Sequence, residues 1–243
     1  NNSYNFQSSG LDEDYVVISS DPQNQATAGM TLEAWVFPSS EPILEDMSSI
    51  VSYATFINPD TESGYGFFYK PITGKWHFVV VVANDNNVLS QIDSWPGVEI
   101  EADTWTHIAG TYDGAIARIF KNGVEEANYT SPGGAIVWEN IDTELFIGKY
   151  INDNTSFHGF IDEVRIWEIA RLESEIQNSI NEVVSSDQSG LIGYWNFNDN
   201  QSFTISSQVE GGTPGLLNNA GNGGWATDVF AGGSDECFDK LIT

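Results

Sequence analysis

Apolar and polar residues alternate along the chain in short runs that are separated by turn residues. In the run 30–38, Leu32, Ala34 and Val36 occupy every second position. Because successive side chains of a β-strand point to opposite faces of a sheet, this spacing predicts a strand with one face in a core. The same criteria predict strands at 4–18, 50–57, 65–70, 75–83, 88–92, 105–112, 117–121, 125–129, 145–150, 157–167, 191–198 and 225–230.

Turn residues separate these runs at regular intervals. The Asp-Gly pair at 113–114 and the Asn-Gly pair at 122–123 are typical of tight hairpins, because both residue types tolerate positive φ angles. A proline and a glycine within 71–74 predict another hairpin. The glycine-rich stretch 211–224 predicts a connection rather than a strand.

Helical spacing of apolar residues is convincing in one place, where Leu172, Ile176 and Ile180 lie four positions apart. We therefore expect one short helix near 171–184. Many short strands with a single helix indicate an all-β protein, built as a two-sheet antiparallel sandwich.

The stretch 157–167 combines this alternation with charge. Strict alternation puts Asp162 on the same sheet face as Val164 and Ile166, and puts Ile161 and Glu163 on the opposite face. An isolated buried carboxylate costs several kcal/mol. Asp162 is therefore expected to be paired, hydrogen-bonded or bound to a cation.

The residues GFIDEVRIW at 159–167 also resemble the signature strand of laminin-G-like jelly-roll domains, a concanavalin A-like group that includes the pentraxins. Other segments that resemble the same family, in the expected order, are 4–18, 30–38, 105–114, 117–125, 145–150, 190–198 and 224–230. The resemblance implies one jelly-roll domain over residues 1–231. Residues 232–243 are then a C-terminal tail or the start of a linker.

Composition narrows the possible partners. Eight Lys and Arg against 35 Asp and Glu give a formal charge of −27, which argues against nucleic acid and anionic membranes as partners. The single cysteine, Cys237, cannot form an internal disulfide. No apolar run is long enough to cross a bilayer, so membrane insertion is not expected. We expect the domain to be secreted or displayed on a cell surface.

The resemblance further implies one structural calcium ion. In related jelly rolls, the aspartate that matches Asp162 binds the ion together with backbone carbonyls of an N-terminal turn, which here corresponds to Ser8 to Gly10. Asp14 and Asp113 are additional candidate ligands. Calcium prefers six to eight oxygen ligands, so carboxylates and carbonyls suit it.

The N-terminal turn departs from the family pattern, and Asp162 has an alternative role. The family turn usually reads Phe-Asp-Gly, whereas this chain has Phe6, Gln7 and Ser8, which removes a ligand at position 7. The alternative role for Asp162 is a buried acid that pairs with Arg165 or with backbone amides.

Aromatic residues provide the candidate ligand-binding surface, because flat rings stack on the C–H faces of sugars. The chain has eight Trp and nine Tyr. Tyr65 and Tyr69 share one strand face, which is either a stacking ledge or part of the core. The candidates at strand ends or beside polar loops are Tyr53, Tyr65, Tyr69, Trp76, Trp95, Trp138 and Tyr150.

Catalysis has weaker support. Laminarinases and agarases of the same fold carry their nucleophile and acid at alternating positions of one strand. Glu139 and Asp142 are three positions apart and would face opposite sides, whereas retaining chemistry needs two carboxyl groups within about 5.5 Å. No catalytic residue is assigned. A lyase that uses His77 and a tyrosine is a further possibility.

The expected function is a non-catalytic extracellular binding module with a structural Ca²⁺ ion. Its expected partners are a polysaccharide or cell-surface glycan, and other domains of a larger multidomain protein. The first alternative is a protein-interaction or adhesion module that binds no sugar. The second is a glycosidase or polysaccharide lyase, since one fold hosts many activities.

Overall fold

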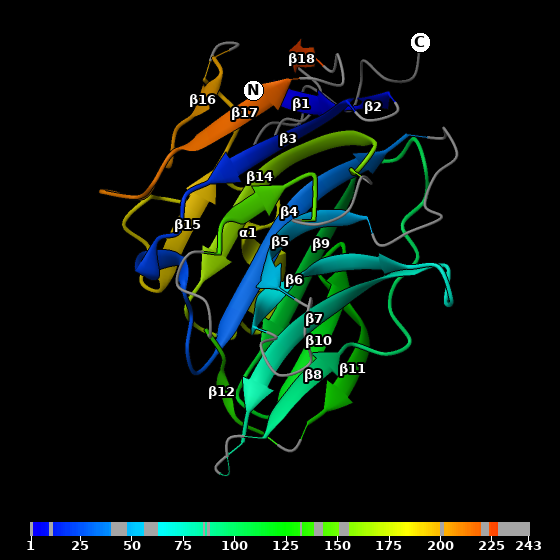
Figure 1. The fold of residues 1–243 in the computed structure, drawn as a ribbon, viewed down its shortest axis with the longest axis vertical. Helices are drawn as coiled ribbons and strands as arrows, with labels where there is room; N and C mark the ends of the chain where they lie inside the picture. The colour runs from blue at the N-terminus through cyan, green and yellow to red at the C-terminus, as the bar shows by residue number, and fades with distance from the viewer. Residues whose placement is uncertain are drawn as a thin grey trace.

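Two antiparallel sheets pack face to face in the computed structural model (Figure 1). The structure describes residues 2–9, 12–39, 48–55, 63–84, 86, 88–131, 133–138, 143–150, 156–199, 202–219 and 224–227. This arrangement confirms the all-β jelly-roll sandwich. The predicted domain end at residue 231 and the tail 232–243 lie outside the described residues.

The first sheet has the strand order β11-β10-β9-β4-β14-β1-β18, and β15 also pairs with β14. Its strands are β1 (Asn2–Phe6), β4 (Met30–Pro38), β9 (Thr106–Tyr112), β10 (Ile116–Lys121), β11 (Val124–Thr130), β14 (Gly159–Trp167), β15 (Leu191–Trp195) and β18 (Gly224–Thr227). β14 lies between β1 and β4, so the signature strand is central in the first sheet.

The second sheet has the order β12-β7-β6-β5-β13-β3-β17-β16, with β2 paired to β3 and β8 paired to β7. Its strands are β2 (Ser8–Ser9), β3 (Asp12–Ile18), β5 (Ser49–Thr55), β6 (Ser63–Lys70), β7 (Lys75–Ala83), β8 (Leu89–Asp93), β12 (Ala135–Ile136), β13 (Leu145–Ile147), β16 (Thr204–Ile205) and β17 (Gly215–Asn219). The chain crosses repeatedly between the two sheets: β3 belongs to the second sheet, β4 to the first and β5 to the second again.

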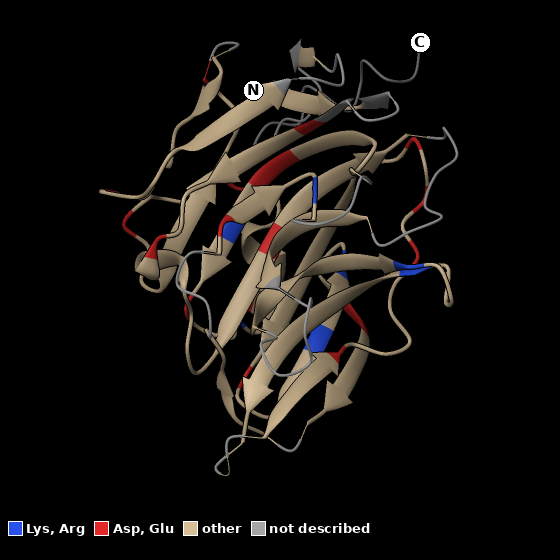
Figure 2. Ribbon diagram, viewed as in Figure 1, with Lys and Arg blue, Asp and Glu red and all other residues tan. Residues whose placement is uncertain are grey.

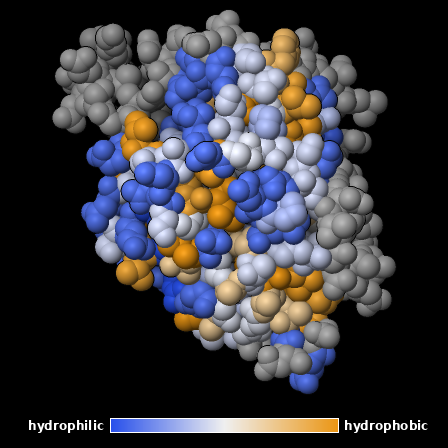
Figure 3. Space-filling view, turned by 90° about the vertical axis from the view of Figure 1, so that its left-hand side faces the viewer, coloured by the Kyte–Doolittle hydropathy of each residue, from blue (hydrophilic) through white to orange (hydrophobic). Residues whose placement is uncertain are grey.

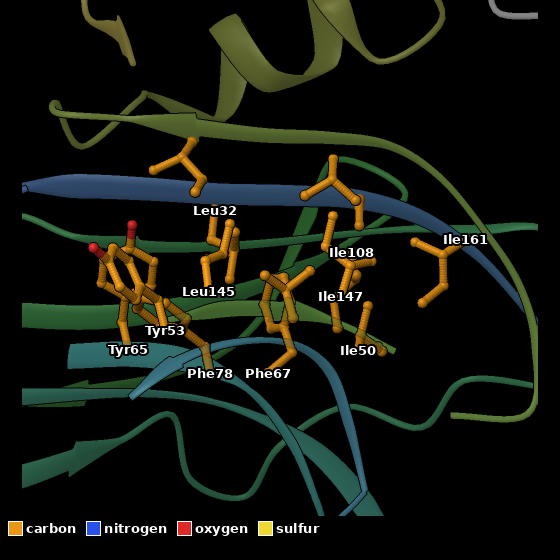
Figure 4. Close-up of a cluster of buried hydrophobic side chains, with 14 of the residues drawn as sticks. Leu32, Ile50, Tyr53, Tyr65, Phe67, Phe78, Ile108, Leu145, Ile147 and Ile161 are labelled. Atoms are coloured by element: carbon orange, nitrogen blue, oxygen red, sulfur yellow. The ribbon is translucent and has the colours of Figure 1, made fainter. Parts of the chain in front are cut away.

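The core fills the space between the sheets. Leu32, Ile108 and Ile161 of the first sheet belong to one cluster with Phe67 and Phe78 of the second, and all five are fully buried (Figure 4). Burying apolar area is the main favourable term in folding, at about 25 cal/mol per Å².

A β-bulge in β14 makes the strict alternation predicted for this strand wrong. The pairing register with β4 shifts between Asp162 and Arg165, and Glu163 has a φ of 53°. The extra residue changes the parity of the strand, so Ile161 lies in the same core as Val164 and Ile166. Asp162 therefore faces away from the core, on the outer face of the first sheet.

Two further predictions are corrected. Residues 215–219 lie within the stretch expected to be a connection, but they form β17 and pair with β3 from Gly215–Ile18 to Asn219–Asp14. The helix is shorter than 171–184: α1 spans Glu173–Ser179, and a 3-10 turn, η1, spans Pro22–Asn24. Neither these helices nor any other in the described residues is long and apolar enough to cross a membrane.

Helix α1 covers the outer face of the first sheet. Its residue Ile176 is fully buried and forms a small cluster with Ala109 and Phe120. Below it, the Glu33 carboxylate lies 2.5 Å from Nη1 of Arg171 and 3.3 Å from Nε2 of His107.

The charged groups beneath the helix pair with one another, but Glu33 Oε2, His107 Nδ1 and Arg165 Nε have no hydrogen-bond partner among the described residues. Burial raises the pKa of Glu33, but the close contact with His107 and the charge of Arg171 outweigh it and lower the pKa to about 2. Nη2 of Arg165 donates to Glu163 at 2.5 Å, and the Tyr194 hydroxyl donates to Glu163 at 2.6 Å. Figure 2 shows acidic colour within β4, and both colours within β14. This network explains how charged side chains are accommodated in central strands.

The sheets approach closely at Gly110, which predicts a strong effect of a small substitution. A Cβ at this position would lie 2.3 Å from Cγ and Cδ2 of Phe78. We expect Gly110→Ala to lower the free energy of unfolding by about 1–3 kcal/mol through overpacking, measured by chemical denaturation. Gly224→Ala is the control, because no atom of the described residues lies within 4 Å of its Cβ position. Equal stability of the two variants would contradict this packing.

Candidate functional site

A pocket of about 340 Å³ opens where the end of β4, the turn between β6 and β7, and the segment before β14 meet. Three aromatic residues, Tyr69, Trp76 and Phe157, form part of its wall. The ring centroids of Tyr69 and Trp76 are 5.6 Å apart, and those of Trp76 and Phe157 are 5.9 Å apart. Trp76 and Phe157 are buried and Tyr69 is half-buried, so Tyr69 is the ring with the most surface left for a ligand.

Polar groups line the rest of the pocket. Ser39, Glu99 and His158 contribute to it, and Glu99 is exposed. The Ser39 backbone N–H donates to the His158 carbonyl at 2.9 Å, which joins the two segments. An aromatic wall with a few polar groups at its rim is the usual composition of a small-molecule site.

Backbone pairing holds the pocket together. Trp76 and Val98 exchange two backbone hydrogen bonds of 2.8 Å, and these place Glu99 beside the Trp76 ring. The Tyr69 backbone N–H donates to the Ser48 carbonyl at 2.9 Å. Tyr69 and Trp76 are among the predicted aromatic candidates, whereas Glu99 and His158 were not predicted. No spacing rule links them, because these segments are far apart in the chain.

The expected exposure of several aromatic candidates is wrong. Tyr53, Tyr65, Trp76 and Tyr150 are 1%, 0%, 4% and 4% exposed. Figure 4 shows Tyr53 and Tyr65 within the buried cluster. The Tyr65 hydroxyl donates to the Asn24 carbonyl at 2.7 Å, so this ring has a buried partner at its polar end. Of the two alternatives for the Tyr65 face, the core is correct.

Trp138 and Trp95 have different surroundings. Trp138 is partly buried against the core, and its indole N–H donates to the Ala26 carbonyl at 2.8 Å. Trp95 is 55% exposed. In the view of Figure 3, hydrophobic surface is divided into small areas between hydrophilic ones.

The predicted calcium ligands do not gather within the described residues. Asp113 accepts from the backbone N–H groups of Ala115 and Ile116 at 3.0 and 2.8 Å, and from Arg118 at 2.7 Å. It therefore closes the β9–β10 hairpin. Asp14 accepts from the Gln7 backbone N–H at 3.0 Å. No three His, Cys, Asp or Glu side chains in the described parts of the chain are arranged to hold a metal ion.

Asp162 is buried, and a neighbouring backbone N–H donates to its carboxylate. Its Oδ1 accepts the Glu163 backbone N–H at 2.8 Å, whereas Arg165 pairs with Glu163 instead. Burial and the Glu163 charge raise the pKa of Asp162 well above its usual value of 3.8. The β1–β14 register, with Tyr4 opposite Ile161, puts Ser3 next to Asp162.

The same register separates Asp162 from the predicted turn. Phe6 pairs with Gly159, three positions from Asp162, and Ser8 lies beyond that end of the ladder. Gly10 and the Ser8 side chain lie outside the described residues. The Ser3 hydroxyl is fully buried and has no hydrogen-bond partner among the described residues. It is therefore the polar atom nearest to Asp162 in register that still needs a partner.

The sandwich and its topology define the class of jelly-roll domains, and comparison with known proteins gives the family. The sequence profile of the concanavalin A-like lectin/glucanases superfamily matches residues 9–177. The chain belongs to this superfamily, which confirms the resemblance to laminin-G-like domains.

Solved structures share the fold. A candidate carbohydrate-binding protein from Bacteroides ovatus is 19% identical, with a TM-score of 0.67, and the match covers 93% of this chain and 59% of that chain. Domain 4 of an extracellular GH43 arabinanase from Geobacillus stearothermophilus, solved with arabinotriose, is 18% identical with a TM-score of 0.51 and covers 70% and 74%. A heptameric SAP-like pentraxin from Limulus polyphemus is 13% identical with a TM-score of 0.51 and covers 90% and 96%. At these identities the likeness shows the fold alone.

One curated relative matches locally. Pappalysin-1 from Mus musculus is 31% identical over 75 residues, which is 30% of this chain and 4% of that protein. The chain therefore spans a small part of the curated relative that it matches.

Because Trp76 is buried, we expect that removing its ring destabilises the folded protein. We expect Trp76→Ala to lower the free energy of unfolding by about 3–5 kcal/mol, because a large buried ring leaves a cavity. Trp95→Ala, at an exposed position, should change it by no more than about 0.5 kcal/mol. Chemical denaturation measures both. A neutral Trp76→Ala would show that this ring is not part of the core.

Proposed function

We propose that this domain is a non-catalytic glycan-binding module, secreted or displayed on a cell surface. The observation that carries the proposal is the pocket formed by Tyr69 and Trp76 with polar groups at its rim. A sugar ring can place its C–H face on an aromatic side chain and its hydroxyl groups on Ser39, Glu99 and His158.

Two further observations support the proposal. The superfamily is named for lectins and glucanases, and structures of the same fold include a candidate carbohydrate-binding protein and an arabinanase domain solved with arabinotriose. The local match to a much longer curated protein supports a role beside other domains of a larger chain.

The charge of the protein suggests which glycans fit. With a formal charge of −27 and Glu99 at the pocket, anionic polysaccharides would be repelled. Uncharged polysaccharides are therefore the preferred ligands.

Affinity electrophoresis in gels that contain arabinan, arabinoxylan, laminarin or alginate tests this function. We expect an uncharged polymer to retard the protein, and Tyr69→Ala to weaken that binding at least about tenfold by removing the stacking surface. Tyr129→Ala is the control, because Tyr129 is an exposed ring on β11.

Three results would contradict the proposal. Retardation by none of these polymers would favour the protein-interaction alternative. Equal retardation of wild type and Tyr69→Ala would exclude the pocket as the site. Release of reducing ends, or of unsaturated uronate, would show an enzyme.

A structural calcium ion at Asp162 is a second part of the proposal. It is supported by the Asp162 carboxylate, which is 2% exposed, and by the Ser3 hydroxyl next to it in register, which has no partner in the described part of the chain. A bound cation would remove the cost of burying the ionised carboxylate. Both groups are oxygen ligands of the kind that calcium prefers, and carbonyls or waters would complete the set.

Thermal melting of wild type and Asp162→Asn, in calcium and in chelator, tests the ion. We expect chelator to lower the wild-type Tm, and Asp162→Asn to have a lower Tm than wild type in calcium and to be insensitive to chelator. Glu126→Gln, an exposed acid on β11, is the control.

The opposite result follows if no cation binds. When folding raises the pKa of a carboxyl group, the folded protein loses stability as pH rises from about 4 through the folded pKa, because the buried group must then ionise. Asp162→Asn would then match or exceed wild-type stability at pH 7, and chelator would have no effect. That combination would exclude calcium.

A further inference from the structure

Trp95 is an exposed aromatic ring that the pocket does not use. It is 55% exposed, so more than half of its surface remains accessible to a ligand. It lies in the segment that follows β8, and its ring centroid is 5.9 Å from that of His77. A single exposed aromatic ring is common on protein surfaces, so the case for a site rests on the polar groups that surround Trp95.

The His77 ring, against which Trp95 packs, is held by side-chain hydrogen bonds on both of its nitrogens. The His77 side chain is fully buried, and its Nδ1 lies 2.5 Å from Oδ1 of Asp93. Its Nε2 lies 2.8 Å from Oγ1 of Thr73. Gly97 allows the segment to approach, because a Cβ there would lie 2.6 Å from His77 Nε2, and its φ is 78°.

Lys70 and Asp93 are partly exposed beside this support. Nζ of Lys70 lies 2.5 Å from Oδ2 of Asp93, and each side chain is 21% exposed. Burial raises the pKa of Asp93, but the hydrogen bonds from His77 and Lys70 outweigh it and lower the pKa. Asp93 is therefore a carboxylate at neutral pH.

Both groups keep hydrogen-bonding capacity for a ligand. A lysine ammonium has three donors and a carboxylate about four acceptor sites. The contacts within the described residues use one donor of Lys70 and two acceptor sites of Asp93. Ordered donors and acceptors beside a half-open indole can bind the hydroxyl groups of a sugar stacked on the ring.

This surface is separate from the pocket. Trp76 and His77 are neighbours on β7, but Trp76 belongs to the core and lines the pocket, whereas His77 faces outward. We propose that Trp95, Lys70 and Asp93 form a second glycan-binding site, on the outer face of the second sheet, for an uncharged sugar. The inference rests on the proposed glycan binding and extends it to two contacts with one polymer.

The charges favour an uncharged ligand. Lys70 and Asp93 form an ion pair, so the site carries no net charge that would favour a charged group on the ligand. The net charge of −27 disfavours anionic sugars. A cationic ligand over the indole is the competing possibility, because a tryptophan face attracts cations.

NMR of the indole N–H groups tests the second site directly. The Trp95 resonance is assigned by its absence in Trp95→Phe, and arabinotriose, xylotriose or laminaritriose is then titrated into Tyr69→Ala protein. We expect one of these sugars to shift the Trp95 resonance. In affinity electrophoresis, Trp95→Ala should weaken polymer binding at least about tenfold, and Tyr69→Ala with Trp95→Ala should weaken it further than either change alone.

Phe203→Ala is the matched control, because Phe203 is 66% exposed and precedes β16, at the opposite end of the second sheet from β7. If Tyr69→Ala weakens binding while Trp95→Ala does not and its resonance stays unchanged, the second site is wrong and the pocket stands. If the reverse holds, the pocket is wrong and the second site stands.

Two other outcomes overturn the inference. A Trp95 shift produced by choline chloride but by none of the sugars would assign the surface to cations. Absence of binding to every polymer by the wild-type protein would overturn both sites together.

Discussion

Contact between the inner faces of the two sheets is the interaction on which the rest of the structure depends. Phe67 and Phe78 of one sheet meet Leu32, Ile108 and Ile161 of the other with no exposed surface. Removing that much apolar area from water offsets the entropy of ordering a long chain with many turns. Because the interior is filled by side chains, ligands have access to the rim and the outer faces.

Helix α1 covers charged side chains on the outer face of the first sheet, and these side chains are paired with one another. Glu33, Arg171 and His107 form one set of contacts under α1, and Glu163, Arg165 and Tyr194 form another. Buried charges are tolerated when they are paired in this way. The helix is short, with seven residues, so tertiary contacts rather than helix propensity hold it in place.

The candidate sites lie on the two sides of one strand. β7 directs Trp76 toward the rim pocket and His77 toward the surface that carries Trp95. The segment 93–99 supplies groups to both, since Asp93 and Trp95 lie at one end of it and Glu99 at the other. A polysaccharide that contacts both sites would gain affinity from two linked contacts without a deep groove.

The sequence by itself determined the all-β class, most strand positions, the hairpin turns and the family. Alternation with period two and Asp-Gly or Asn-Gly turns are local properties, and they survive folding unchanged in β4 and in the β9–β10 hairpin. It also identified Asp162 as a buried acid, although for the wrong face of the strand.

Tertiary structure decided the rest. The bulge at Glu163 reverses the faces of β14, and periodicity cannot detect one inserted residue. Pairing with β3 makes a strand of 215–219, whose glycine and asparagine residues have little intrinsic strand preference. Which tyrosines are buried, and which polar groups gather around Tyr69 and Trp95, depends on contacts between segments far apart in the chain. No local pattern encodes such contacts, because they arise only when the two sheets meet.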